Sequence, residues 1–191
     1  MQLRVKDLRW EMNDIAIQEL NSVQPKAMVK VRARQALIAI LQNAFSGELA
    51  AAYAYRGHWK SLRDPDERER VRSIENDEWV HRANVLRMLT ETGSAPRRVR
   101  EVRAWLIGRT IGFGCHLVGW FLPMYFAGRL ESQNIEEYEV AAKHSRVLGL
   151  EQFVAELRTM ADVERDHEAF FRGKVADHRL LPVLRSLFKW G

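Results

Sequence analysis

The sequence predicts an all-α protein built around one bundle of helices, and three observations support this fold class. Apolar residues recur at spacings of three and four over long segments, no segment alternates in the manner of a strand, and the chain holds only 11 Gly and 5 Pro. With 191 residues, 47% of them hydrophobic, it is long enough to bury one sizeable core. Its single cysteine excludes a disulfide framework and a four-cysteine metal site, and favours a reducing compartment.

Breakers and caps divide the chain into its expected helices. These cover 3–20, 26–60, 65–92, 98–148 with a bend at Pro123, and 151–173, followed by an amphipathic tail at 177–190. Pro25 marks a helix start, Asp64 caps the helix that begins at Pro65, and Glu67 is spaced to bond back to that cap. The expected organisation is an N-terminal amphipathic helix (1–25), a helical bundle (26–175) and a basic amphipathic C-terminal tail (176–191).

Four of these helices carry an apolar stripe interrupted by a glutamate. The stripes contain Leu37, Leu41, Ala44, Glu48, Ala51, Tyr55 and His58; Val71, Ile74, Glu78, His81, Val85 and Met88; Ala127, Glu131, Ile135 (or Asn134), Tyr138 and Ala142; and Phe153, Leu157, Met160, Glu164, His167 and Phe171. Unpaired glutamates in a core are costly, and four that face one another also repel. Two divalent cations balance four carboxylates, so the stripes predict a metal centre.

The ligand pattern is that of dinuclear iron centres in four-helix bundles. Such centres take one glutamate from each of two helices and Glu-x-x-His from each of two others. Here these are Glu48 and Glu131, then Glu78 with His81 and Glu164 with His167. The alternative is that chance spacing has placed these residues on solvated helix faces.

The order of these residues also indicates a weak internal repeat. Glu48 precedes Glu78 by 30 residues, and Glu131 precedes Glu164 by 33. A tyrosine follows each lone glutamate by seven residues, Tyr55 in the first half and Tyr138 in the second. These tyrosines are candidate catalytic residues that hydrogen-bond a ligand or substrate or carry an electron, although core aromatics are the simpler interpretation.

Several weaker features bear on the surroundings of the centre. Acidic residues that flank the motifs are candidate partners for the histidines: Glu75, Asp77, Asp162 and Asp166. The remaining histidines are expected in the core or at the surface: His58, His116, His144 and His178. Aromatic side chains predict an apolar channel that admits a substrate: Trp105, Phe113, Trp120 and Phe121.

The charge balance favours anionic partners. The chain has 30 basic and 25 acidic residues, a net charge of +5, and an isoelectric point of about 9.6. Arginines precede the apolar run and form either a solvated face or a contact with lipid phosphates: Arg97, Arg98, Arg100, Arg103 and Arg109. The uncharged run 110–128 is at the lower length limit for a membrane span, so a buried or membrane-facing helix is expected instead. The tail fits an interfacial segment, a last core-packing turn or a homodimer contact.

Together, these motifs resemble those of the demethoxyubiquinone hydroxylase family of ubiquinone biosynthesis. The resemblance covers roughly residues 35–190. It rests on Gly47-Glu48 with Tyr55 and Gly57, on Glu78-Trp79-Val80-His81, on Glu131 with Tyr138, and on Glu164-Arg165-Asp166-His167. Ala44-Phe45-Ser46, Ser132 and Glu137 depart from the family pattern, and none of them is among the six ligand positions.

The resemblance implies a ferritin-like fold and a centre of two iron ions. It implies the ligands Glu48, Glu78, His81, Glu131, Glu164 and His167, with Glu78 and Glu164 as the bridging carboxylates. The implied activity is an O2-dependent monooxygenase that hydroxylates a polyprenyl benzoquinone, with an external electron donor. The implied location is cytoplasmic, peripheral on the anionic inner face of the cell membrane.

Two other classes use the same ligands. A tRNA-modifying hydroxylase suits the basic charge, although the apolar tail makes nucleic acid the less favoured partner. An iron-handling or oxidative-stress protein is the second such class. A further alternative, which does not depend on these ligands, is a non-catalytic helical adaptor at the membrane.

Overall fold

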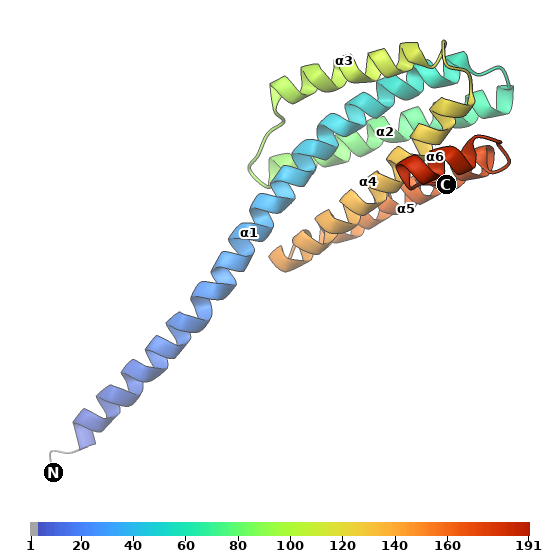
Figure 1. Ribbon diagram of the computed structural model, residues 1–191. Helices are drawn as coiled ribbons and strands as arrows, with labels where there is room; N and C mark the ends of the chain where they lie inside the picture. Colours follow the sequence, from blue (N-terminus) through green and yellow to red (C-terminus); the bar gives the residue numbers. More distant parts are fainter. Residues whose placement is uncertain (1–3) are drawn as a thin grey trace.

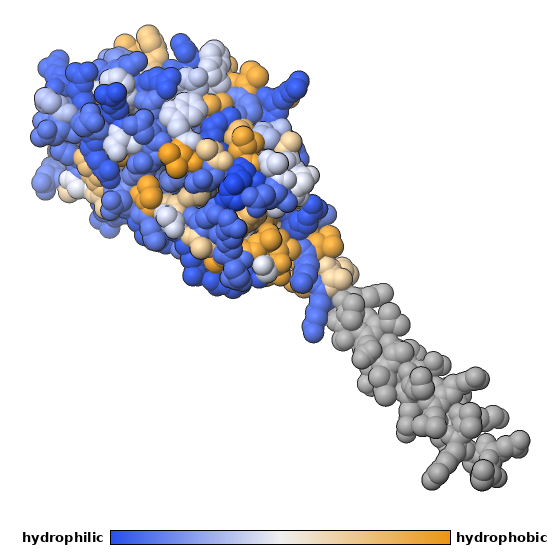
Figure 2. Space-filling view, turned by 180° about the vertical axis from the view of Figure 1, so that it is seen from behind, coloured by the Kyte–Doolittle hydropathy of each residue, from blue (hydrophilic) through white to orange (hydrophobic). Residues whose placement is uncertain are grey.

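The computed structural model describes the backbone of residues 4–191 and the side chains from residue 26 onward. It contains six helices: α1 (Arg4–Ser61), α2 (Pro65–Glu91), α3 (Arg98–Gly114), α4 (Phe121–Leu148), α5 (Glu151–Val175) and α6 (Leu181–Phe188). No strand occurs in the part of the chain described, so the predicted all-α class is confirmed. The face of the body seen in Figure 2 carries hydrophobic side chains in separate groups among hydrophilic ones.

The predicted helix boundaries hold at α2 and at the turn between α4 and α5. The Asp64 carboxylate accepts hydrogen bonds from the backbone N–H groups of Asp66 and Glu67, both at 2.9 Å, as expected of an N-cap. The Glu67 side chain pairs with Lys174 on α5 at 3.0 Å. Gly149 ends α4 in the left-handed region, with φ of 77°, and α5 begins two residues later.

The prediction of one bent helix over 98–148 is wrong. The chain forms α3 and α4 with a break at 115–120 between them, and Gly119 in this break has φ of 76°. Pro123 lies in the first turn of α4. A proline is accommodated there because the first N–H groups of a helix have no partner within the helix.

The predicted helix start at Pro25 is also wrong, because α1 is a single helix from Arg4 to Ser61. A proline inside a helix loses one hydrogen bond and crowds the carbonyl four residues earlier, which is unfavourable but does not prevent the helix from continuing on both sides. The side-chain pattern predicted for the N-terminal helix within 1–25 lies outside the described residues.

Four helices share the core: α1, α2, α4 and α5. Two apolar clusters lie at different heights along these helices, and each takes side chains from all four. On α2, for example, Val71 and Ile74 belong to one cluster, and Val85 and Met88 to the other. The glutamates of the four stripes lie between the two clusters, so the core is apolar, then polar, then apolar along its length.

Helix α3 lies outside this group and packs along α1 (Figure 1). Glycines allow the two backbones to touch. A Cβ atom added at Gly57 would overlap the backbone of Gly112, and one added at Gly108 would overlap the backbone of Ala50. The outward face of α3 is strongly apolar, with exposed Val99, Val102, Leu106, Ile107, Ile111 and Phe113.

The C-terminal segment folds back onto α4 and α5 (Figure 1). The Trp190 side chain is buried, its indole N–H donates to Glu168 at 2.8 Å, and its carbonyl accepts from the Tyr125 hydroxyl at 2.8 Å. Three interpretations of the tail were open, and Trp190 fits that of a core-packing turn. Val183 and Leu187 on α6 remain exposed. No helix among the residues described combines the length and hydropathy needed to cross a membrane.

Candidate metal centre

The structure brings the six predicted ligand residues together in the polar layer of the core. They come from all four core helices and are buried, with exposed fractions of at most 3%. They form two overlapping groups: Glu48, Glu78, His81 and Glu164; and Glu78, Glu131, Glu164 and His167. Within each group, one potential ligand atom per residue lies within 4.8 Å of all the others.

The two shared residues are the glutamates of the Glu-x-x-His motifs. Glu78 and Glu164 belong to both groups, whereas Glu48 and His81 are found only in the first group and Glu131 and His167 only in the second. The geometry follows from the helix, because residues three apart share one face of it. Each motif therefore aims its carboxylate and its imidazole at the same point.

Both imidazoles present Nδ1 to the acidic layer. His81 Nδ1 lies 3.0 Å from Glu164 Oε1, and His167 Nδ1 lies 3.1 Å from Glu164 Oε2. His167 Nε2, on the other side of its ring, is 3.1 Å from the carboxylate of Asp77. A carboxylate in that position holds the ring in place and favours a proton on Nε2, which leaves Nδ1 as the ligand atom.

The two tyrosine hydroxyls bind the two glutamates that are not shared. The Tyr55 hydroxyl donates to Glu131, and the Tyr138 hydroxyl donates to Glu48. Each tyrosine thus bonds the glutamate of the opposite half of the chain. Both bonds are buried, so they fix the orientation of these two carboxylates.

Burial and mutual repulsion perturb the carboxyl groups of the layer. The pKa values of Glu78 and Glu131 are raised well above 4.5 by burial, by Glu164 and by the other glutamates. Burial also raises the pKa of Glu48, although the neighbouring Glu78 carboxyl group opposes this. Glu164 differs: burial raises its pKa, but the hydrogen bond with His167 and the nearby His81 imidazole outweigh burial and lower the pKa to about 2.

Several ligand atoms have no hydrogen-bond partner among the side chains described. They are Glu48 Oε2, both carboxylate oxygens of Glu78, Glu164 Oε1 and His81 Nδ1. The close contact between His81 Nδ1 and Glu164 Oε1 lacks the alignment of a hydrogen bond, so both atoms remain unpartnered. Unpaired buried oxygens are rare in folded proteins, and their convergence here fits the donor set of a multivalent cation.

Comparison with protein-family models, with curated proteins and with solved structures finds no match to this chain. The interpretation of the centre therefore depends on its own geometry and on the motifs.

Three of the four acidic residues proposed as histidine partners do not contact a histidine in the described part of the chain. Only Asp77 reaches a histidine. The buried carboxylate of Glu75 accepts hydrogen bonds from Arg56 and Trp59, both at 2.7 Å. Asp162 pairs with the exposed Arg165, and Asp166 is itself exposed.

The residues predicted to line an apolar channel do not line the apolar cavity that the structure has. Trp105, Phe113 and Trp120 are exposed and Phe121 is buried, and none of them lines the cavity that reaches Tyr55. The break between Gly114 and Phe121 is the reason, because Trp105 and Phe113 belong to α3 and Phe121 to α4, so these side chains do not share one helix face.

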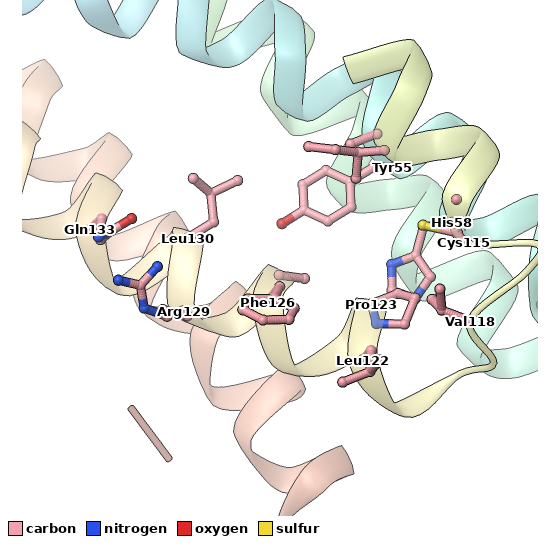
Figure 3. A pocket seen from close by; sticks show the side chains of 14 residues that line it. Tyr55, His58, Cys115, Val118, Leu122, Pro123, Phe126, Arg129, Leu130 and Gln133 are labelled. Carbon is pink, nitrogen blue, oxygen red and sulfur yellow. The ribbon is translucent and has the colours of Figure 1, made fainter. Parts of the chain in front are cut away.

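An apolar pocket of about 430 Å³ lies between α1, α3 and α4 (Figure 3). Aliphatic and aromatic side chains form most of its wall, including Ile111, Val118 and Phe126, and its polar members include Tyr55 and His58. Tyr55 is shared with the acidic layer, because its hydroxyl bonds Glu131. The sequence did hold a signal for His58, which belongs to the same stripe as Glu48 and Tyr55.

Proposed function

We propose that this chain is a ferritin-like four-helix protein with a dinuclear, carboxylate-bridged metal centre that activates O2. The observation that carries the proposal is the pair of overlapping ligand groups that share Glu78 and Glu164. Two metal sites with two common carboxylates are the arrangement expected of bridging ligands. A structural ion-pair network would instead bring compensating lysines or arginines into the layer, and no such side chain among the residues described lies within salt-bridge distance of the six.

The ligand roles follow from which group each residue joins. Glu78 and Glu164 bridge, Glu48 and His81 complete one site, and Glu131 and His167 complete the other. Mixed carboxylate and imidazole ligands favour iron or manganese over zinc. Four carboxylates also balance the charge of two divalent ions, so the bound centre has no large net charge in the apolar interior.

We propose that the reaction is a monooxygenation. Iron bound by the six residues would supply O2 activation: one oxygen atom would enter a C–H bond of the substrate and the other would leave as water, with two electrons and two protons from an external reductant. The chain's own part is to hold the ligands and exclude water. Tyr55 and Tyr138 keep the two terminal carboxylates oriented, and Asp77 keeps His167 in the tautomer that exposes Nδ1.

The proposed substrate class is a lipid quinone, specifically a polyprenyl benzoquinone. The motif resemblance suggests it, and two features of the surface support it. The pocket beside Tyr55 is apolar, and the exposed apolar face of α3 carries arginines at its edges, among them the exposed Arg98, Arg103 and Arg109. Apolar side chains flanked by arginines suit a membrane that exposes anionic lipid, so we propose that the protein works at the cytoplasmic surface of the cell membrane.

Metal analysis tests the centre. We expect two irons per chain after anaerobic reconstitution and the loss of both in Glu164→Ala, because a bridging ligand serves both sites. Glu69→Ala is the matched control, since Glu69 is an exposed glutamate on α2. Less than half an equivalent of any transition metal in the wild type would contradict the proposal.

Quinone profiling of a deletion strain tests the reaction. Accumulated demethoxyubiquinone that is cleared by the wild type and not by His167→Ala would support it. Unchanged quinones with an intact metal centre would reject the substrate and favour iron handling or a different substrate. Co-flotation with anionic vesicles, reduced in Trp105→Ala, tests the membrane contact separately.

A further inference from the structure

The pocket beside the centre has a buried imidazole that the proposed function does not use. His58 lies in its wall next to Tyr55 and Cys115 (Figure 3). The remainder of this end of the pocket is apolar, with Val118, Leu122 and Pro123 around it. An isolated imidazole in such a wall needs an explanation.

The imidazole of His58 is held rigidly and lacks a partner. Its exposed fraction is 2%, and its ring lies beside two others, Tyr55 at 6.5 Å between centroids and Phe171 at 6.2 Å, which are 5.9 Å from each other. Nε2 is buried and has no hydrogen-bond partner within the residues that the structure describes. A buried polar nitrogen without a partner is destabilising, so a position that retains one usually supplies it to a ligand or to an ordered water.

We propose that this pocket binds an apolar ring compound that carries an oxygen atom, and that His58 Nε2 makes the hydrogen bond that recognises this oxygen. The inference deepens the proposed function and rests on it for the identity of the reaction, because it names the group that positions the substrate. Binding itself needs only the pocket and the imidazole. His58 is thus a positioning residue and lies outside the metal ligand set.

The chemistry of the pocket favours a neutral oxygen over a charged one. Burial lowers the pKa of His58 to about 4, so the ring is uncharged near neutral pH. A neutral imidazole donates from one nitrogen and accepts at the other, which suits a carbonyl or a hydroxyl group. Arg129 and Gln133 line the pocket apart from His58 (Figure 3), so a charged group would find its partner away from the imidazole.

The size of the pocket and its connection to Tyr55 also fit a substrate. About 430 Å³ is within the range of small-molecule sites and holds one substituted ring with a short apolar chain. Tyr55 connects the pocket with the acidic layer, because it lines the pocket and its hydroxyl donates to Glu131. A ring held by His58 would therefore lie beside the side chain that links the pocket to the centre.

Binding of two matched probes to the metal-loaded protein tests the inference. The probes are ubiquinone with one isoprene unit and prenylbenzene, which has the ring and the chain without the oxygens. We expect His58→Phe to weaken binding of the quinone by about five- to tenfold, the effect of one lost hydrogen bond, and to leave prenylbenzene unchanged. His58→Gln should restore part of the difference. Val118→Ala, an apolar change in the same wall, should affect both probes equally.

Each outcome decides between the inference and the proposed function. Equal quinone affinity in wild type and His58→Phe would overturn the inference and leave a bound water as the partner of Nε2. Failure of the wild type to bind the quinone would overturn it as well. A further outcome is that the protein binds no metal while His58→Phe still weakens binding of the quinone and not of prenylbenzene. That result would support the inference and reject the proposed function. If His58→Phe does not fold, His58→Leu removes the same hydrogen bond, and an unchanged affinity of that variant for the quinone would then overturn the inference.

Discussion

Replacing Glu78 by glutamine should make the metal-free protein more stable and the metal-loaded protein less so. The amide keeps the shape of the side chain and removes one negative charge from a layer that holds three other buried glutamates. Without metal, that charge is unfavourable because of burial and repulsion. With metal, the same charge bridges two cations. Opposite effects in the two states distinguish a metal centre from an ordinary buried polar network, where the substitution destabilises throughout.

The size of the first effect follows from proton linkage. The pKa of Glu78 in the folded metal-free protein is raised well above its ordinary value of 4.5, first by burial and then by Glu48 and Glu164. A group whose pKa is raised on folding contributes its stability at low pH and loses it as the pH rises. As the pH rises above 4.5 the wild type therefore loses stability relative to Glu78→Gln, at a rate of at most about 1.4 kcal/mol for each pH unit.

Urea unfolding of protein freed of metal by a chelator, at about pH 4 and pH 7, measures this difference in the free energy of unfolding. We expect nearly equal stabilities at pH 4 and a more stable Glu78→Gln at pH 7. Ferrous iron at a thousand times its dissociation constant should then add about 4 kcal/mol to the wild type and much less to the variant. Glu69→Gln, the exposed control on α2, should change neither value. Equal or lower stability of metal-free Glu78→Gln at pH 7, or equal protection of both proteins by iron, would refute the reasoning.

Four further outcomes test other parts of the structure. Tyr138→Phe removes the hydroxyl that bonds Glu48 and should cost about 1 kcal/mol in urea unfolding while both metals are retained; loss of metal would instead make the tyrosine essential to the site. Gly57→Ala places a Cβ atom in the backbone of α3 and should cost about 1–3 kcal/mol, with faster proteolysis within α3; an unchanged cleavage rate would contradict the close packing. Trp190→Ala removes a buried indole and should cost about 3–5 kcal/mol in thermal unfolding, against no measurable change if the C-terminal turn is dispensable. The pKa of His58 falls from 6.5 to about 4 on folding, so the wild type should lose about 3 kcal/mol relative to His58→Phe as the pH falls through that window; parallel pH profiles would show that the ring is not buried.

The acidic layer was predictable because helical periodicity carries positional information. Spacings of three and four place Val71, Ile74, Glu78 and His81 on one face of a helix, and a face that includes valine and isoleucine must point inward. The same argument places Glu164 beside Leu157 and Met160. No tertiary information was needed to infer that the glutamates are buried, and the structure brings all six ligand residues together.

The pocket was not predictable in this way because it depends on a break in the chain. The uncharged run 110–128 favours one helix, and Pro123 within it indicates a bend rather than the break that the structure has at 115–120. The structure ends α3 at Gly114 and resumes at Phe121, which creates a corner. His58 acquires its position in a pocket wall from that corner, although its own periodicity fixed only its burial.

The two tyrosines illustrate how the internal repeat becomes a single site. Seven residues of helix advance by about 10.5 Å, so neither tyrosine can reach the glutamate that it follows in sequence. Antiparallel packing of α1 against α4 resolves this, because residue 48 then faces residue 138 and residue 55 faces residue 131. Each half of the chain supplies the tyrosine that orients the terminal carboxylate of the other half. Both groups of candidate ligands also draw on both halves, because Glu164 joins the first group and Glu78 the second, so they come together only when the core assembles.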